Sequence, residues 1–187
     1  MKKGIHILSS LLIVFGLASC KGCKDVVDKV FPGTEFAAPS IDISIPAVPP
    51  IAVSFPEFPL GSYSQRLNLD SAIRANTGGA FGVGSVTSIK LKQVTLSLSD
   101  GDENNNLSNF ESARVMLSSN SQSNAVELFK ITFPTANTST LTHSPTDTPE
   151  LLPYLKGGEL TYEVFGKARR STSKTLNLTV SVVIRGK

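Results

Sequence analysis

One segment near the middle of the chain carries oxygen side chains at a spacing that suits a metal ion. In residues 100–111 (DGDENNNLSNFE), Asp100, Asp102 and Asn104 stand at positions 1, 3 and 5, and Glu111 stands at position 12. Calcium prefers carboxylate and carbonyl oxygens, and a glutamate at position 12 commonly completes its coordination. The spacing therefore predicts a calcium site made by these four side chains.

This segment resembles the D-x-D-x-N loops of EF-hands and related calcium repeats. It departs from them at Asn105, where those loops have glycine, although asparagine tolerates left-handed backbone better than most residues. The flanking helices of an EF-hand are also missing, because the preceding residues alternate like a strand. Asp, Asn and Gly are typical of any long hairpin connection. A solvated loop between Leu98 and Val115 therefore remains the alternative.

A basic segment near the C-terminus is the second candidate contact site. Lys167, Arg169, Arg170 and Lys174 fall within eight residues, in the turn expected between the last two strands. Four cations on one tip could contact the phosphates of anionic lipid or lipopolysaccharide, at about 1 kcal/mol each near a charged surface. The alternative is a solvated turn without a ligand.

Catalytic side chains are scarce. Outside the N-terminal segment the sequence has one histidine, His143, in a polar stretch, and it contains no G-x-S-x-G motif. One histidine and one thiol cannot supply a usual zinc ligand set. A pair of carboxylates of the glycosidase type stays open, but none of the acidic residues is marked by its context. The absence of tryptophan also makes a sugar-binding module the weaker binding hypothesis. We therefore expect no enzyme, with a hydrolase as the minority alternative.

The N-terminal segment has the features of an export signal. Lys2 and Lys3 precede an apolar run over residues 5–18. This run is shorter than the ~20 residues that a membrane-spanning helix needs. A positive start followed by a short apolar stretch is typical of a signal peptide. We expect residues 1–19 to be removed.

The end of this run, Leu17-Ala18-Ser19-Cys20, resembles the lipobox of bacterial lipoproteins. The resemblance implies a diacylglycerol thioether on Cys20, cleavage before it and acylation of the new amino terminus, as with palmitate. Two or three acyl chains would anchor the protein to a membrane permanently. Lys21 stands where enterobacterial lipoproteins retained in the inner membrane have aspartate, so the outer membrane is favoured. The alternative is an ordinary secretory signal with a chance cysteine.

Charge limits the classes of partner. Cleavage before Cys20 removes two lysines and no acid, which lowers the formal net charge from +3 to +1. A near-neutral chain lacks the electrostatic footprint of a nucleic-acid-binding protein. The expected partners are the membrane, through the N-terminal lipid, and another envelope protein.

The remaining chain divides into a tether and one domain. Seven prolines between Pro32 and Pro59 favour extended chain, and we expect a lipidated tether and proline-rich spacer over residues 20–39 and a single domain over 40–187. Helices are expected over 68–76 and from Thr148-Pro149-Glu150 onward. Alternation of apolar residues predicts strands at 41–45, 51–55, 89–98, 113–118, 125–133, 159–167 and 175–185.

These elements predict an all-β fold, an antiparallel β-sandwich of immunoglobulin-like or jelly-roll-like type with one or two short helices. A change of phase near Lys92 and Gln93 predicts a bulge in one strand. The order of elements weakly resembles the sandwich domains of uncharacterised envelope lipoproteins, a resemblance of pattern that carries no functional residues. The expected function is non-enzymatic binding or a structural role at the cell envelope. The alternative is a calcium-dependent binding module or hydrolase that uses loop 100–111.

Overall fold

Alternating apolar residues place β8 inside one of two sheets. The computed structural model describes residues 34–187, in which β8 (Leu176–Gly186) lies between β1 (Thr34–Ile45) and β3 (Ile89–Leu98). β6 (Thr140–His143) pairs with the other side of β3, so the order is β1-β8-β3-β6. Successive side chains of a strand point to opposite faces. One face of β8 therefore buries the residues that alternate in the sequence: Leu176, Leu178, Val180, Val182 and Ile184.

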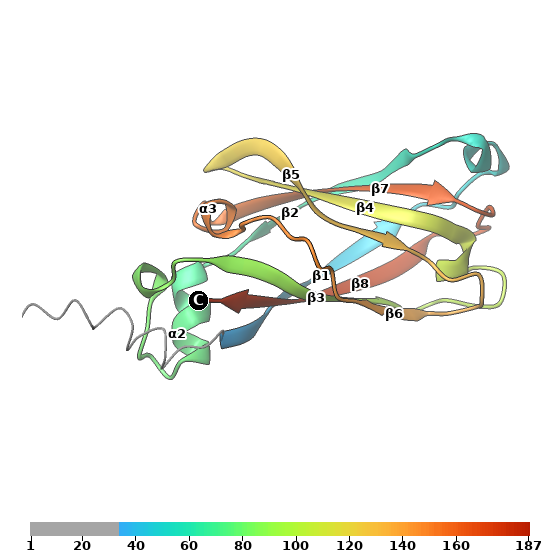
Figure 1. Cartoon of the computed structure of the whole chain (residues 1–187). Helices are drawn as coiled ribbons and strands as arrows, with labels where there is room; N and C mark the ends of the chain where they lie inside the picture. Colours follow the sequence, from blue (N-terminus) through green and yellow to red (C-terminus); the bar gives the residue numbers. More distant parts are fainter. Residues whose placement is uncertain (1–33) are drawn as a thin grey trace, which may run out of the picture. The chain divides into compact units, whose positions relative to one another are not determined.

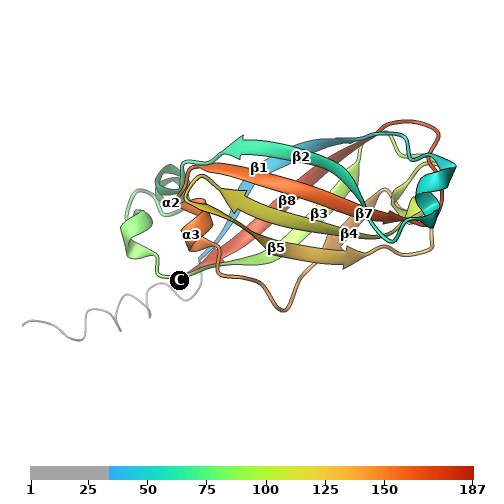
Figure 2. The ribbon, with the colours of Figure 1, turned by 90° about the horizontal axis from the view of Figure 1, so that it is seen from above.

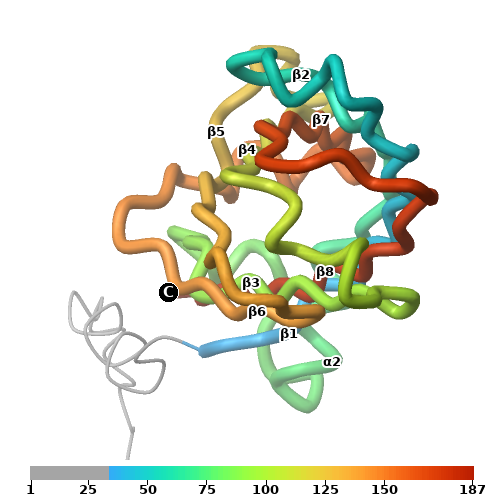
Figure 3. Tube along the Cα trace, turned by 90° about the vertical axis from the view of Figure 1, so that its right-hand side faces the viewer, coloured from blue at the N-terminus to red at the C-terminus, as the bar shows by residue number. Residues whose placement is uncertain are grey.

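The second sheet packs on this buried face. It contains β2 (Phe58–Arg66), β7 (Glu159–Ala168), β4 (Phe110–Ser119) and β5 (Gln122–Thr132), in the order β2-β7-β4-β5. All neighbouring strands in both sheets are antiparallel. Figure 1 shows the sheets as two layers, Figure 2 shows one sheet lying over the other, and Figure 3 shows the layers end on. The predicted β-sandwich is confirmed.

The strand order distinguishes between the two sandwich types that the sequence left open. Consecutive strands lie in different sheets, except for β4 and β5, which form a hairpin. Each sheet is thus built mainly from strands that are distant in the sequence. This arrangement results when one long β-hairpin is rolled around the axis of a barrel. The orders β1-β8-β3-β6 and β2-β7-β4-β5 are those of an eight-stranded jelly roll, with two Greek keys.

The core lies between the two layers. Its fully buried side chains come from both sheets and include Ile89, Val94, Leu117, Leu160 and Leu176. Each such side chain stabilises the fold by about 1.5–3 kcal/mol relative to an exposed position. The apolar interior, rather than any cross-link among the described residues, accounts for the packing of the layers.

The bulge predicted in β3 is confirmed. The register between β3 and β8 shifts between Leu91 and Gln93, so that one extra residue, Lys92, stands in β3. Leu91 and Val94 are both buried, whereas Lys92 is exposed. The bulge returns the apolar residues on either side of it to the same face.

The first strand begins earlier than predicted. Residues 34–39, expected to belong to the spacer, lie in β1, where Thr34 pairs with Gly186 and Ala38 with Val182. Pro39 stands where the register with β8 shifts, between Ala38 and Ile41. A proline is tolerated there because a bulge at a sheet edge requires no ladder hydrogen bond from its nitrogen.

Residues 51–55, predicted to be a strand, are not one. They fall within and just after η1 (Pro50–Ser54), a short 3-10 helix in the connection between β1 and β2. Proline at the first helical position favours this turn. Only Ala52 is fully buried, and Ile51 and Phe55 remain 67% and 46% exposed. The alternation of apolar residues here reflects a surface turn rather than a half-buried strand.

The predicted first helix is present, and the second starts later than predicted. α2 (Leu69–Asn76) is capped by Asn68, whose side chain accepts from the Ser71 N–H at 2.9 Å. α3 spans only Leu152–Leu155. The Glu150 carboxylate accepts from the N–H groups of Ile89 and Leu152, so Glu150 joins β3 to the start of this helix.

Two further 3-10 turns, η2 (Val83–Ser85) and η3 (Leu107–Asn109), lie in connections.

Two strands, β2 and β6, were not predicted. Among residues 34–187, no helix has the length and apolar character needed to cross a bilayer.

The sandwich has two different ends. The chain enters the described domain at Thr34, beside the C-terminal strand end and near α2 and α3. β1 has 12 residues, so it carries the chain about 40 Å along the sandwich, at ~3.3 Å per residue. The opposite end, here named the loop end, carries residues 46–57, 99–109, 133–139 and 169–175, which connect strands of the two sheets.

Candidate functional site

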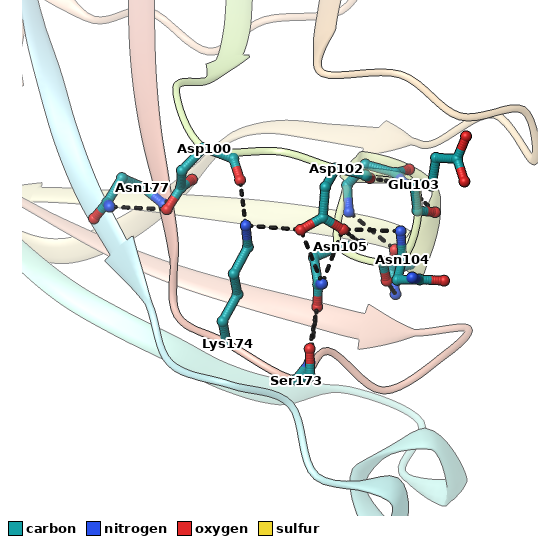
Figure 4. A network of polar contacts seen from close by, with 10 residues as sticks. Asp100, Asp102, Glu103, Asn104, Asn105, Ser173, Lys174 and Asn177 are labelled. Carbon is teal, nitrogen blue, oxygen red and sulfur yellow. Dashed lines mark hydrogen bonds and ion pairs between the residues drawn. The ribbon is translucent and has the colours of Figure 1, made fainter.

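The predicted calcium loop lies at the loop end, between β3 and β4. One carboxylate oxygen of Asp102 accepts from the backbone N–H groups of Asn104 and Asn105, both at 2.9 Å, and from the Asn105 amide at 3.0 Å. Its other oxygen lies 2.8 Å from the Lys174 ammonium (Figure 4). The hydrogen bond from Lys174, followed by that from Asn105, lowers the pKa of Asp102 to about 2. Asp102 is therefore ionised and already surrounded by donors.

The other predicted metal ligands face different partners. The two oxygens of Asp100 accept from the backbone and side-chain nitrogens of Asn177, at 2.9 and 3.0 Å. Glu111 lies in β4 and pairs with Lys167 at 2.8 Å. Within residues 34–187, no group of three or more His, Cys, Asp or Glu side chains is placed to hold a metal. Calcium binding stays a prediction, and it would require the displacement of Lys174 from Asp102.

The same loop contains asparagines that are buried and fully hydrogen-bonded. The side-chain oxygen of Asn106 accepts from the N–H and hydroxyl of Ser108, at 3.0 and 2.7 Å. Its amide donates to the carbonyls of Asp102 and Glu103 and to the side chain of Asn137. An unpaired polar group in such a position would cost about 1–3 kcal/mol. No such unpaired side-chain atom is found in the described part of the chain.

Two more asparagines join this loop to the turn between β7 and β8. Asn109, 1% exposed, donates from its amide to the carbonyls of Asn104 and Ser171, at 2.9 and 2.8 Å. The side-chain oxygen of Asn105 accepts from the N–H of Ser173 at 2.8 Å. These bonds make one rigid unit of two segments that are more than sixty residues apart in the sequence.

Two of the four predicted surface cations, Arg169 and Lys174, also belong to this unit. Arg169 donates to the carbonyls of Ser108, Phe133 and Pro134 at 2.8–3.1 Å. Lys174 bonds to Asp102 and to the carbonyl of Asp100, and Lys167 pairs with Glu111. The predicted contact of all four cations with an anionic surface stays untested, but Arg169 and Lys174 hold neighbouring loops in place. Lys167, expected in the turn, lies in β7 and joins this strand to β4.

Arg170 differs from the other three. Its side chain is exposed, and its one hydrogen bond runs from Nη2 to the Ser108 hydroxyl, at 2.6 Å. Among the described residues, no carboxylate forms an ion pair with Arg169 or Arg170. Within the described chain, the positive charge of these two arginines is therefore not neutralised by an ion pair.

An open hollow of about 760 Å³ lies between these loops. Its apolar wall comes from the connection between β1 and β2, with Val48, Pro49, Pro50 and Val53. The facing wall is polar and includes Asn104, Arg170 and Ser171, with no carboxylate or histidine among the lining residues. A ligand in this hollow would meet apolar surface on one side and hydrogen-bond donors on the other.

The apolar wall is fixed to the polar wall by a pair of hydrogen bonds. The Val48 N–H donates to the Thr172 hydroxyl at 2.8 Å, and the Thr172 N–H donates to the Val48 carbonyl at 3.0 Å. Val48 and Thr172 are 1% and 6% exposed. The hollow is thus preformed by the fold.

Sequence reasoning missed two exposed side chains in the connection that forms the apolar wall. Ile51 and Phe55 are the exposed large hydrophobic residues of the described chain, and both lie in or next to η1. Their alternation with Val53 predicts a strand, whereas the structure has a turn. The proline pair before Ile51 was the signal for a turn, which would have placed these side chains on the surface.

The remaining candidates lie away from the hollow or outside the described residues. His143 ends β6 and pairs with Val94, and no hydrogen bond within residues 34–187 joins its side chain to a serine or a carboxylate. Tyr162 lies in the core, and burial raises its pKa to about 12. The predicted signal segment and Cys20 lie outside the described residues.

Comparison with known proteins provides no family: no protein-family model matches the chain, and no curated protein matches it. The jelly-roll topology defines a fold that serves many functions. The functional argument therefore depends on the loop end and on the N-terminal sequence.

Proposed function

We propose that this chain is a lipid-anchored protein of the bacterial cell envelope that binds a protein partner through its loop end and performs no catalysis. The observation that carries the proposal is the preformed hollow at the loop end, together with the exposed Ile51 and Phe55 in the connection that forms its apolar wall. The sequence Leu17-Ala18-Ser19-Cys20 supports the lipid anchor.

The position of this surface suits display from a membrane. Thr34, where the chain enters the domain, and the loop end lie at opposite ends of β1. An anchor before residue 34 would leave the loop end free to face a partner. Binding residues commonly lie on loops that a rigid scaffold positions, and here the asparagine network supplies the rigidity.

The energetics favour a protein partner. Ile51 and Phe55 lose the benefit of burial while they remain exposed, and each would contribute about 1.5–3 kcal/mol if an interface buried it fully. A few apolar or aromatic side chains with a cationic neighbour often dominate an interface. Arg170, which lines the hollow together with Pro50 and Val53 of η1, supplies the cation here. Because the hollow is lined by neither carboxylate nor histidine, it offers no general acid or base of the usual kinds.

Photo-crosslinking in intact cells tests the binding surface. The full-length protein would carry a photoreactive amino acid in place of Ile51, and a matched control would carry it in place of Ala75, at the exposed C-terminal part of α2. We expect adducts with an envelope protein from position 51 and not from position 75. Phe55→Glu should abolish the adduct without unfolding the protein, because Phe55 is exposed. Equal adducts from both positions would contradict the proposal.

Metabolic labelling tests the anchor. Cells expressing the full-length protein would be labelled with radioactive palmitate, and Cys20→Ser would be compared with Cys23→Ser. We expect Cys20→Ser to lose the label and to leave the membrane fraction, and Cys23→Ser to keep both. A Cys20→Ser protein that is labelled like the wild type would show that the lipobox interpretation is wrong.

A further inference from the structure

We infer that the hollow at the loop end binds an acidic, apolar peptide segment, whose carboxylate pairs with Arg170 and whose aliphatic side chains pack on the proline-rich wall. This inference rests on the proposed function and adds the chemistry of the partner. It follows from the charges, free donors and apolar surface of the lining residues.

The charge of the hollow favours an anion. Arg169 and Arg170 line it and no carboxylate does. The two nearby lysines are neutralised by other residues, since Lys174 of the same turn pairs with Asp102, and Lys167, in β7, pairs with Glu111. The uncompensated charge is therefore concentrated on the two arginines rather than spread over the turn.

Of these two, Arg170 is the one placed to receive a carboxylate. Arg169 has both of its terminal nitrogens bonded to backbone carbonyls. Arg170 uses Nη2 for the Ser108 hydroxyl, and its Nε and Nη1 have no partner in residues 34–187. A guanidinium has five N–H donors in a planar fork, which suits bidentate binding of a carboxylate. The bond to Ser108 orients the fork before a ligand arrives.

Two more polar side chains of the hollow are available. Within the described chain, no side-chain hydrogen bond is formed by the Asn104 amide or by the Ser171 hydroxyl, and both residues line the hollow. They can bind the backbone amides and carbonyls of a peptide. The opposite wall, with Val48, Pro49 and Val53, offers packing surface to its apolar side chains. The volume of about 760 Å³ lies within the range of ligand sites, ~300–1,000 Å³.

A lipid or lipopolysaccharide surface fits these observations less well. Binding to such a surface depends on several free cations presented together. Of the four cations in residues 167–174, only the two arginines lack a carboxylate partner among the described residues, and they line a hollow with an apolar wall. A single anionic group joined to an apolar chain matches that arrangement better than a layer of phosphates.

A matched pair of peptides tests the inference. The probes are two N-acetylated, C-amidated tetrapeptides, alanine-leucine-glutamate-alanine and its glutamine analogue, added to the isotope-labelled full-length protein in zwitterionic detergent. We expect the glutamate peptide to shift the NMR signals of the Asn104 and Ser171 amides in a saturable way. The glutamine peptide should bind at least about tenfold more weakly, as expected for loss of a charged bidentate bond.

Protein variants assign the effect to Arg170. Arg170→Gln should remove the preference for glutamate, whereas Arg66→Gln, an exposed arginine at the other end of the sandwich, should keep it. Signals outside the loop end report whether each variant is folded. Equal binding of both peptides, or no shift at the loop end, would overturn the inference. So would acetate or inorganic phosphate binding as tightly as the glutamate peptide, because the apolar wall would then have no role.

The crosslinking experiment separates this inference from the proposed function. If position 51 forms its adduct but the peptides do not discriminate, the partner uses the loop end by another chemistry, and only the inference fails. If position 51 also gives no specific adduct, the proposed function fails with it.

Discussion

The ammonium of Lys174 lies 2.8 Å from the carboxylate of Asp102. This contact joins the acidic loop and the basic turn, which the sequence presents as two separate candidate sites. Each supplies the partner that the other lacked, so most of the charge in both is used to hold the loop end together. The groups left for a ligand are those without such a partner, above all Arg170.

The contact predicts a particular dependence of stability on pH. The folded pKa of Asp102 is about 2, whereas an unfolded aspartate has a pKa of about 3.9. A lowered folded pKa means that the ionised carboxylate stabilises the fold above the unfolded pKa, and that this contribution disappears as the pH falls through the folded pKa. We expect the free energy of unfolding to decrease between pH ~4 and ~2 more steeply for the wild type than for Asp102→Asn. Urea titrations over this range measure both. Parallel curves would show that the ion pair does not contribute.

The buried asparagines predict a large loss of stability on truncation. Asn109→Ala removes the acceptor of the Asn106 N–H and leaves the carbonyls of Asn104 and Ser171 without their donor. We expect a cost of about 2–4 kcal/mol, because several buried groups lose their partners. Asn104→Ala is the matched control, since that side chain is exposed, and it should change stability by less than ~0.5 kcal/mol. Chemical denaturation measures both, and similar values for the two variants would contradict the role given to Asn109.

Calcium provides a further test of the loop. Since Asp102 is bonded to Lys174 and Asp100 to Asn177, we expect millimolar calcium to leave the melting temperature of the wild type unchanged. Lys174→Met removes the cation that pairs with Asp102. If calcium raises the melting temperature of any variant, we expect it to be this one. A rise in the wild type that is lost in Asp100→Ala with Asp102→Ala would instead establish the calcium site predicted from the sequence.

Much of the fold follows from local patterns, whereas the site depends on contacts distant in the sequence. Alternating apolar residues locate β8 and β3, and even the bulge at Lys92 can be predicted from a change of phase. β6 was missed because Thr140–His143 is short and polar and is a strand only through its pairing with β3. Likewise, nothing near Asn109 in the sequence indicates burial, since residues of the β7–β8 turn cover it. Arg170 could be recognised as available to a ligand only after the partners of Lys167, Arg169 and Lys174 were known.

The link between the two sheets at their β1 and β2 edge gives the last prediction. Tyr63 of β2 donates its hydroxyl hydrogen to the Ser44 carbonyl of β1 at 3.1 Å. Gly61, two residues earlier, has φ +153° at the bulge of β2, and a Cβ there would lie 2.5 Å from the Tyr63 hydroxyl oxygen. Gly61→Ala should therefore cost about 1–3 kcal/mol through backbone strain and displacement of Tyr63.

A loss of this size would lower the melting temperature by several degrees, at ~2–4 °C per kcal/mol for a domain of this length. Gly84→Ala is the control, because its added Cβ would meet no atom within 4 Å, and we expect no measurable change. If the displaced hydroxyl contributes, Gly61→Ala should cost less in a Tyr63→Phe background, where the bond to Ser44 is already absent. An equal cost in both backgrounds would assign the whole effect to the strained backbone and to the tyrosine ring. The hydrogen bond from Tyr63 to Ser44 would then contribute nothing to the loss of stability.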